Sequence, residues 1–164
     1  MTLDRILTLY DYNYWANAKV LDAASQVDQD AFTSPALQSH GSLRGTLVHI
    51  LAVEWMWRMR CRAGESPPRY IPPERFLQLE SIRVAWGEEE KAMRSFLTTL
   101  EDGHLAEPVR YASRQGETRE DALWQVLVHV VNHGTQHRAE AGLRLAELGR
   151  SPGDLDFLLF TRGR

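Results

Sequence analysis

The 164-residue chain has one cysteine, Cys61, which excludes an internal disulfide and a cysteine-rich zinc cluster. It has no basic stripe, because its 19 lysines and arginines are dispersed among 22 acidic residues. The positive surface that phosphate-backbone binding needs is therefore missing. No apolar run approaches the roughly 20 residues of a membrane span, and residues 1–5 lack the basic and apolar parts of a secretion signal. We therefore expect a cytoplasmic protein that binds neither nucleic acid nor a membrane.

Amphipathic helical periodicity is what the sequence does contain. Apolar residues recur at three- and four-residue steps in four stretches, at about 2–25, 42–62, 82–100 and 120–147. Ser42 is a typical N-cap, Gly64 and Gly149 are typical helix ends, and Gly103 is expected to end the third helix. These patterns predict an all-α protein, a four-helix bundle forming a single domain over residues 1–164.

The connections between these helices are of three kinds. Residues 26–41 predict a loop with one turn of helix, and the four prolines within 64–73 block regular structure. A short hairpin is expected over 109–118, before the last long helix. The tail at 154–160 carries enough apolar residues to dock on the bundle.

Three histidines, His129, His133 and His137, recur at intervals of four on the last predicted helix. Residues at i and i+4 lie one above another on a helix, close enough for two imidazoles to bind one metal ion. Projected on the helix, His137 lies nearest the centre of the buried stripe, His133 nearer its edge and His129 furthest out. His133 and His137 are therefore the predicted pair, although a shift of the helix axis would exchange the roles of His129 and His133.

A third ligand is expected from another helix at a similar depth. His49 qualifies, because it shares a face with apolar residues of the second predicted helix. His40 lies in a loop and His104 beside a helix end, where a solvated histidine is common, so both are weaker candidates. Paired imidazoles at a core edge would repel each other if protonated, whereas a divalent ion keeps them neutral.

Other polar residues on the inner faces have two readings. Asn17, Tyr10 and Tyr14 either line a pocket above the ion or are hydrogen-bonded core residues, which is the more frequent case. A second set consists of residues that either orient the ligands or form ordinary ion pairs: Glu54, Arg138 and Glu140.

Four segments together resemble the DinB family of bacterial four-helix-bundle metalloproteins. They are LYDYNYWAN at 9–17, LVHIL at 47–51, HVVNHGTQHR at 129–138 and GRSPGDLDF at 149–157. The resemblance implies one divalent ion held by His49, His133 and His137, as well as a homodimer. The related N-terminal scaffold of mycothiol-dependent maleylpyruvate isomerase has a glutamate at the middle ligand position, where this chain has His133, so that reaction is not carried over.

Three neutral imidazoles leave the ion its full charge and open positions, which activates a bound water or thiol. Zinc or nickel is the first expectation, with iron, cobalt or manganese as alternatives. The resemblance suggests a metal-dependent thiol transferase acting on a small-molecule substrate. Because Cys61 is expected far along its helix from His49, the thiol must be an external low-molecular-weight one, such as bacillithiol or mycothiol.

Two other functions fit the same residues. One is hydrolysis by metal-activated water, and the other is a non-catalytic metal-binding module of a stress response. A structural zinc site is normally closed by a fourth protein ligand, and none is obvious in the sequence, which favours an open site. A di-iron carboxylate site needs two Glu-x-x-His motifs, and only Glu101 to His104 matches, so that chemistry is rejected.

Overall fold

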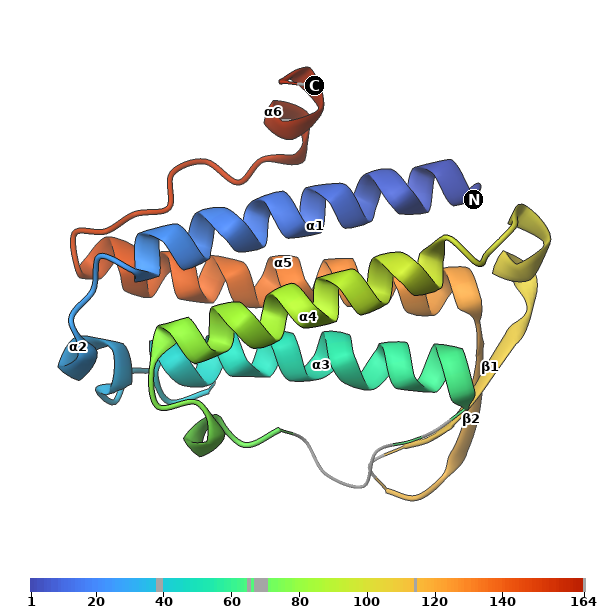
Figure 1. The fold of residues 1–164 in the computed structure, drawn as a ribbon, viewed down its shortest axis with the longest axis horizontal. Helices are drawn as coiled ribbons and strands as arrows, with labels where there is room; N and C mark the ends of the chain where they lie inside the picture. The colour runs from blue at the N-terminus through green and yellow to red at the C-terminus, as the bar shows by residue number, and fades with distance from the viewer. Residues whose placement is uncertain (38–39, 65, 67–70, 114, 164) are drawn as a thin grey trace.

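Four long helices lie side by side and form the body of the protein in the computed structural model (Figure 1). The structure describes residues 1–37, 40–64, 66, 71–113 and 115–163. The long helices are α1 (Leu3–Ala24), α3 (Leu43–Ala63), α4 (Leu79–Leu97) and α5 (Leu123–Glu147). Helix α5 packs on α1 and α3, and α4 closes the other side of the bundle by contacting the same two helices. The predicted all-α bundle is confirmed.

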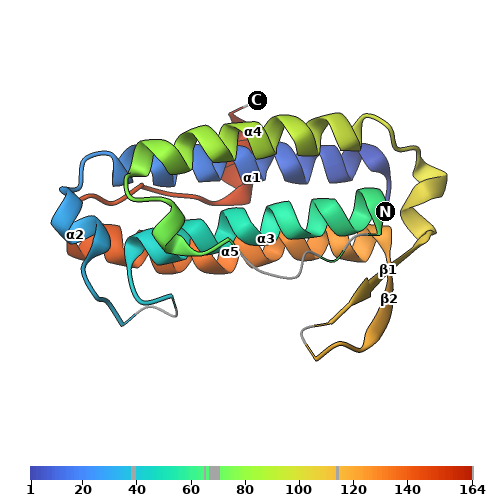
Figure 2. The same cartoon turned by 60° about the horizontal axis from the view of Figure 1, so that its bottom comes forward.

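The chain direction of the helices explains their connections. Helices α1 and α5 run one way, and α3 and α4 run the other way (Figure 1). The segment from α3 to α4 therefore returns along the length of the bundle, as Figure 2 also shows. It includes the 3-10 turn η1 (Pro73–Arg75). Residues 65 and 67–70 of the predicted proline-rich connection lie outside the described residues.

Local signals set most of the helix ends. The Ser42 hydroxyl accepts a hydrogen bond from the Gly45 amide at 3.0 Å and caps α3. At the other end of α3, Gly64 has a φ of 64°, the left-handed conformation that glycine adopts without strain. Both signals were read from the sequence and both are confirmed.

Two predicted boundaries were wrong, both near the hairpin. Helix α4 ends at Leu97 rather than near Gly103, and the 3-10 helix η2 (Asp102–Ala106) follows it. Helix α5 begins at Leu123 rather than at Glu120, because the preceding residues form strand β2 (Thr118–Ala122). This strand pairs antiparallel with β1 (Pro108–Ala112), so its backbone groups are used by the ladder instead of a helix.

Two apolar clusters fill the bundle, with a polar level between them. The first includes Ile6 and Leu127, and the second includes Leu47 and Leu145, all at most 1% exposed. The side chains that fall between the two clusters along α1 and α5 are polar and buried: Asn17, His137 and Arg138.

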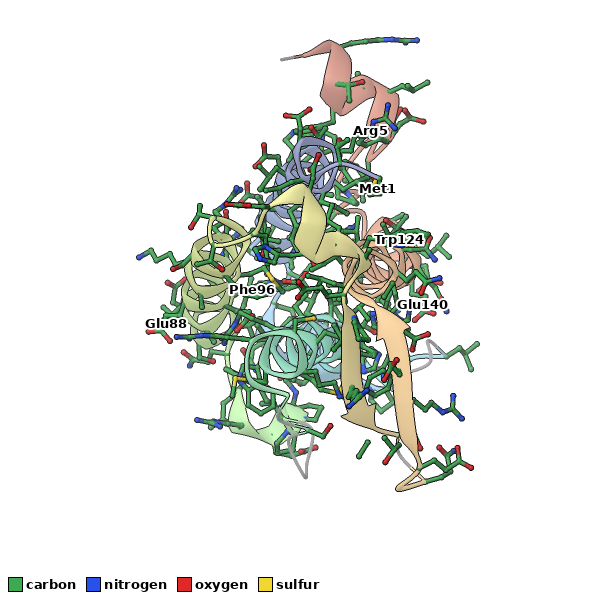
Figure 3. The ribbon with its side chains drawn as sticks, turned by 90° about the vertical axis from the view of Figure 1, so that its right-hand side faces the viewer. Met1, Arg5, Glu88, Phe96, Trp124 and Glu140 are labelled. Atoms are coloured by element: carbon green, nitrogen blue, oxygen red, sulfur yellow. The ribbon has the colours of Figure 1, made fainter. Side chains whose placement is uncertain are left out.

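Two short helices complete the fold. Helix α2 (Gln29–Thr33) is the single turn expected between α1 and α3. Helix α6 (Phe157–Arg162) lies over the outer face of α1, where the Phe160 ring is 5.5 Å from that of Trp15. The predicted docking of the tail is thereby confirmed. Viewed along the bundle, Glu88 points outward from α4 and the hairpin projects below α3 and α5 (Figure 3). Among the described helices, none combines the length and the apolar composition needed to cross a bilayer.

Candidate metal centre

The predicted ligands come from α3 and α5, which face each other in the bundle. His49 lies in the second turn of α3, and His133 and His137 lie in the middle of α5. His137 is buried, His133 is half-buried and His129 is exposed, which is the order predicted from the helix projection. The structure therefore brings the three predicted ligands to one level of the bundle.

The distances between these three rings match those of ligands that share an ion. The Nε2 atoms of His49 and His133 are 3.0 Å apart. Two nitrogens that each bind one ion at about 2.0–2.1 Å lie about 2.9–3.4 Å apart. Because the ring centroid lies about 1.2 Å beyond the nitrogen, the rings of such ligands have centroids about 4.5–5.2 Å apart. The observed separations are 4.9 Å for His49 and His133, 4.6 Å for His49 and His137, and 4.4 Å for His133 and His137. The donor set therefore fits a divalent cation.

The local electrostatics keep the two half-buried rings neutral. Burial, together with the neighbouring rings of His40 and His133, lowers the pKa of His49 to about 3. Burial and the adjacent His137 lower the pKa of His133 to about 4. A neutral imidazole has a free lone pair, so both rings are in the form that binds a metal at neutral pH.

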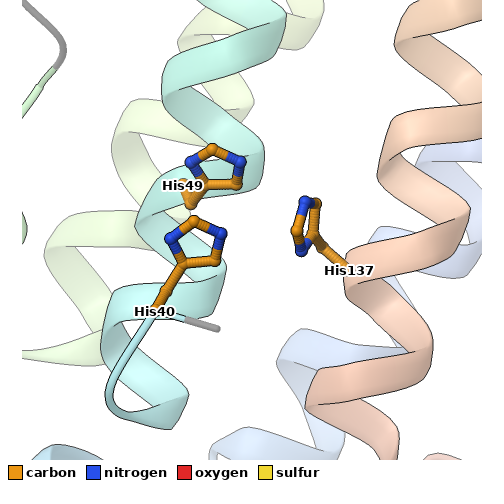
Figure 4. A group of neighbouring side chains, drawn as sticks. All are labelled: His40, His49 and His137. Carbon is orange, nitrogen blue, oxygen red and sulfur yellow. The ribbon is translucent and has the colours of Figure 1, made fainter. Parts of the chain in front are cut away.

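His40 is the ring whose place in the cluster the sequence did not predict. Its ring stacks on that of His49, with centroids 3.7 Å apart and planes at 16°, and it faces His137 at 4.9 Å (Figure 4). One ring nitrogen from each of these three residues lies within 4.8 Å of the other two, which makes His40, His49 and His137 a candidate group for a metal ion among the described residues. In the sequence His40 was the weaker candidate because it lies in a loop, where a solvated histidine is common. The only available signal was its place beside Gly41, just before the helix cap at Ser42.

The remaining two histidines have other surroundings. The His129 ring lies 5.9 Å from that of His133 and packs against Trp57, at the rim of the cluster. His104 accepts a hydrogen bond from the Glu101 amide at 2.9 Å and caps η2. His104 was a weaker candidate in the sequence, and its side chain caps a 3-10 helix instead of joining the histidine cluster.

The sequence left open whether Glu54, Arg138 and Glu140 orient the ligands or form ordinary ion pairs. Of these three residues, Glu140 contacts a predicted ligand. Its carboxylate lies 3.1 Å from Nδ1 of His137, one helical turn away. A carboxylate that accepts this N–H fixes the ring orientation and leaves Nε2 for an ion.

Glu54 and Arg138 instead belong to a buried network that spans the bundle. The Glu54 carboxylate accepts hydrogen bonds from Asn13 at 2.8 Å, from Asn17 at 3.1 Å and from the Trp86 indole at 3.1 Å. Arg138 donates to the side-chain oxygens of the same two asparagines, at 2.5 and 2.8 Å. Burial raises the pKa of Glu54, and the three donors oppose that shift. Asn17 is therefore a hydrogen-bonded core residue.

A cavity of about 350 Å³ opens beside His49 and His133. The hairpin forms one side of it, because Tyr111 on β1 and Arg119 on β2 belong to its wall. Arg60 forms the wall nearest the hairpin and donates to the Ala112 carbonyl at 2.9 Å. Its guanidinium lies 4.5 Å from the Trp57 ring and 4.8 Å from the Tyr111 ring. The sequence showed no sign of this wall, which requires the hairpin to fold back on α3.

Comparisons with known proteins agree with this architecture. The sequence profile of the DinB family matches residues 2–164. Protein DinB of Bacillus subtilis (strain 168) is 24% identical over 164 residues, which covers 96% of this chain and 95% of that protein. The crystal structure of a DinB-like protein from Bacillus cereus ATCC 10987 superposes with a TM-score of 0.70 at 17% identity, covering 93% of this chain and 97% of the other.

Proposed function

Because the chain belongs to the DinB family, we propose that it is a metal-dependent thiol transferase whose ion is held by His49, His133 and His137. The observation that carries this proposal is the 3.0 Å approach of two neutral ring nitrogens from different helices, beside an open cavity. Zinc or nickel fits an all-imidazole donor set. When bound, such an ion supplies Lewis-acid chemistry, lowering the pKa of a thiol that reaches it.

The thiol comes from outside the chain in this proposal. Cys61 lies on the same helix as His49, 12 residues further along, which is about 18 Å of helix. Burial raises the pKa of its thiol to about 12, so Cys61 stays protonated and unreactive at neutral pH. A small thiol entering the cavity would meet the histidines at one end and Arg60 at the other. That cation favours a thiol that carries a carboxylate.

The proposed reaction is a substitution at carbon. The sulfur of the thiol forms a bond to the carbon of an electrophile, the bond from that carbon to its leaving group breaks, and the thiol proton is released to solvent. One thioether, one leaving anion and one proton form for each thiol consumed. The other predictions, a cytoplasmic homodimer forming a single domain and acting in a stress response, stay predictions.

The first test measures metal content. We expect wild-type protein to hold one divalent ion per chain, and we expect His49→Ala, His133→Ala and His137→Ala to lose it. His129→Ala is the matched control, because it removes a neighbouring imidazole from the same helix, and it should keep the ion. Elemental analysis of the purified variants reads this out, with circular dichroism to verify the fold.

The second test measures turnover of the metal-loaded protein. Cysteine, bacillithiol and mycothiol are offered with an alkyl chloride, and thioether and chloride are quantified. We expect equal amounts of both products, and none without thiol. Product in the absence of thiol would indicate hydrolysis instead, and stoichiometric metal with no turnover across the panel would overturn the transferase proposal.

A further inference from the structure

The backbone of His40 is held tightly against the start of α3. A Cβ atom at residue 45 would overlap the His40 carbonyl oxygen, so only glycine there lets the loop approach so closely. Gly41, which follows His40, has a φ of 73°, and its carbonyl accepts a hydrogen bond from the Ala36 amide at 2.9 Å. The loop therefore directs the His40 side chain toward the other histidines (Figure 4).

The ring of His40 lies next to a ligand position without fully occupying it. Its 4.9 Å separation from His137 matches that of two rings sharing an ion. Its 3.7 Å stacking on His49 does not, because two ligands of one ion cannot lie face to face at that distance. A rotation of the His40 side chain that moves its ring away from that of His49 would let His40 share an ion with both His49 and His137. The structure shows the stacked position, and this rotation would bring the ring to a position able to bind.

Space for the ring to withdraw lies beside the cluster. A cavity of about 280 Å³ is lined by His40, Gly45 and His49 and by residues 71–73. This volume is several times the roughly 30 Å³ that one water molecule occupies in the liquid, which leaves room for a side-chain ring. By contrast, His49, His133 and His137 project from long helices, and Glu140 also holds the last of them.

We propose that His40 is a fourth, displaceable ligand, which closes the coordination sphere when no co-substrate is present and yields its place to an incoming thiol. This inference rests on the proposed function for the identity of the incoming group. It adds that the protein has a closed resting state, in which the ion is shielded from adventitious donors, and an open state selected by the thiol. The three helix-borne histidines hold the ion in both states.

X-ray absorption at the zinc edge tests the coordination directly. For the zinc-loaded wild type we expect four imidazoles, changing to three imidazoles and one sulfur when cysteine is added. For His40→Ala we expect one zinc per chain with three imidazoles, and a zinc dissociation constant raised about tenfold in competition with a chelator. Gly45→Ala keeps the imidazole but displaces its backbone, so it should weaken zinc binding in the same direction. His104→Ala, a histidine remote from the cluster, is the control and should bind as the wild type does.

The outcomes separate this inference from the proposed function. Unchanged affinity and coordination in His40→Ala, together with metal loss in His49→Ala and His133→Ala, would overturn the role of His40 alone. Complete metal loss in His40→Ala would make it a permanent ligand and would also overturn its displaceable role. Retention of metal by His49→Ala, His133→Ala and His137→Ala would overturn the predicted ligand set itself.

Discussion

Two polar groups lie inside the same bundle, and they differ in how their hydrogen-bonding capacity is met. In the Glu54 network, the carboxylate accepts three N–H donors, and Arg138 donates to two amide oxygens. In the histidine cluster, ring nitrogens face other ring nitrogens, and His49 and His133 approach to 3.0 Å. The first group is complete within the chain. In the second group, ring nitrogens of several histidines lie close together, an arrangement that a cation completes.

This difference distinguishes a stabilising polar group from a binding one. A buried network with its partners in place links α1, α3, α4 and α5 and makes the helix register unique. Apart from the Glu140 carboxylate beside His137, the histidine rings are gathered mainly against one another, so they lose hydration and gain little in return. The cluster is therefore expected to destabilise the metal-free protein in acid, whereas the network is expected to stabilise the fold with or without an ion.

Removing the Glu54 carboxylate is expected to have the largest effect on stability. Glu54→Ala leaves three donors without an acceptor and Arg138 without its counter-charge, so the free energy of unfolding should fall by about 3–5 kcal/mol. Glu54→Gln, which keeps one acceptor oxygen, should cost less. Denaturation in urea measures both variants. The exposed glutamate Glu88 on α4 provides the control, and a loss in Glu54→Ala no larger than in Glu88→Ala would contradict the role of the network.

A smaller effect is expected at Gly134, which lies on α5 between His133 of the histidine cluster and Arg138 of the Glu54 network. A Cβ atom there would lie 2.6 Å from Nη1 of Arg138 and 2.9 Å from Oδ1 of Asn13. Gly134→Ala should therefore lower the free energy of unfolding by about 1–3 kcal/mol by overpacking. The matched control is Gly87→Ala on the exposed face of α4, where nothing lies within 4 Å. That substitution should raise stability by about 0.5–1 kcal/mol, and equal effects at the two glycines would contradict the close packing at Gly134.

The smallest expected effect is the acid sensitivity of the metal-free cluster. The pKa values of His49 and His133 lie at about 3 and about 4 in the fold, but near about 6.5 in the unfolded chain. The unfolded chain therefore binds more protons below about pH 6.5, and stability falls as the pH is lowered toward about 4. Because both rings are partly exposed, we expect a loss of only about 1–2 kcal/mol between pH 7 and pH 5.

Denaturation at the two pH values in the presence of a chelator measures this loss. The double substitution His49→Gln and His133→Gln removes both titrating rings and should flatten the dependence. A wild-type protein as stable at pH 5 as at pH 7 would show that the cluster carries no such penalty.

Much of the architecture was predictable because it depends on local and periodic signals. The long helices follow from apolar spacing, and the ends of α3 follow from Ser42 and Gly64. The relative depths of the three histidines on α5 follow from their projection around one axis. The convergence of His49 with His133 required only that two inward faces meet at the same level.

Contacts made by loops and by the hairpin were not predictable in the same way. His40 reaches the cluster because the loop closes over Gly45, a tertiary contact without a periodic signature. Residues 120–122 carry helical spacing, yet they pair with β1, so tertiary hydrogen bonding overrode the local pattern. The wall formed by Arg60 and Tyr111 likewise depends on where the hairpin lies.

The separation of His49 from His133 along the chain, 84 residues, has a further consequence. An ion bound by both would close a loop of that length in the manner of a cross-link. In the chain-entropy description, such a closure lowers the conformational entropy of the unfolded chain. This raises its free energy by about 4.5 kcal/mol for as long as the ion stays bound. A protein with one cysteine has no disulfide with which to tie distant segments together. Coordination would give this chain a reversible tether, and the rate of complete unfolding would then be linked to the rate at which the ion is released.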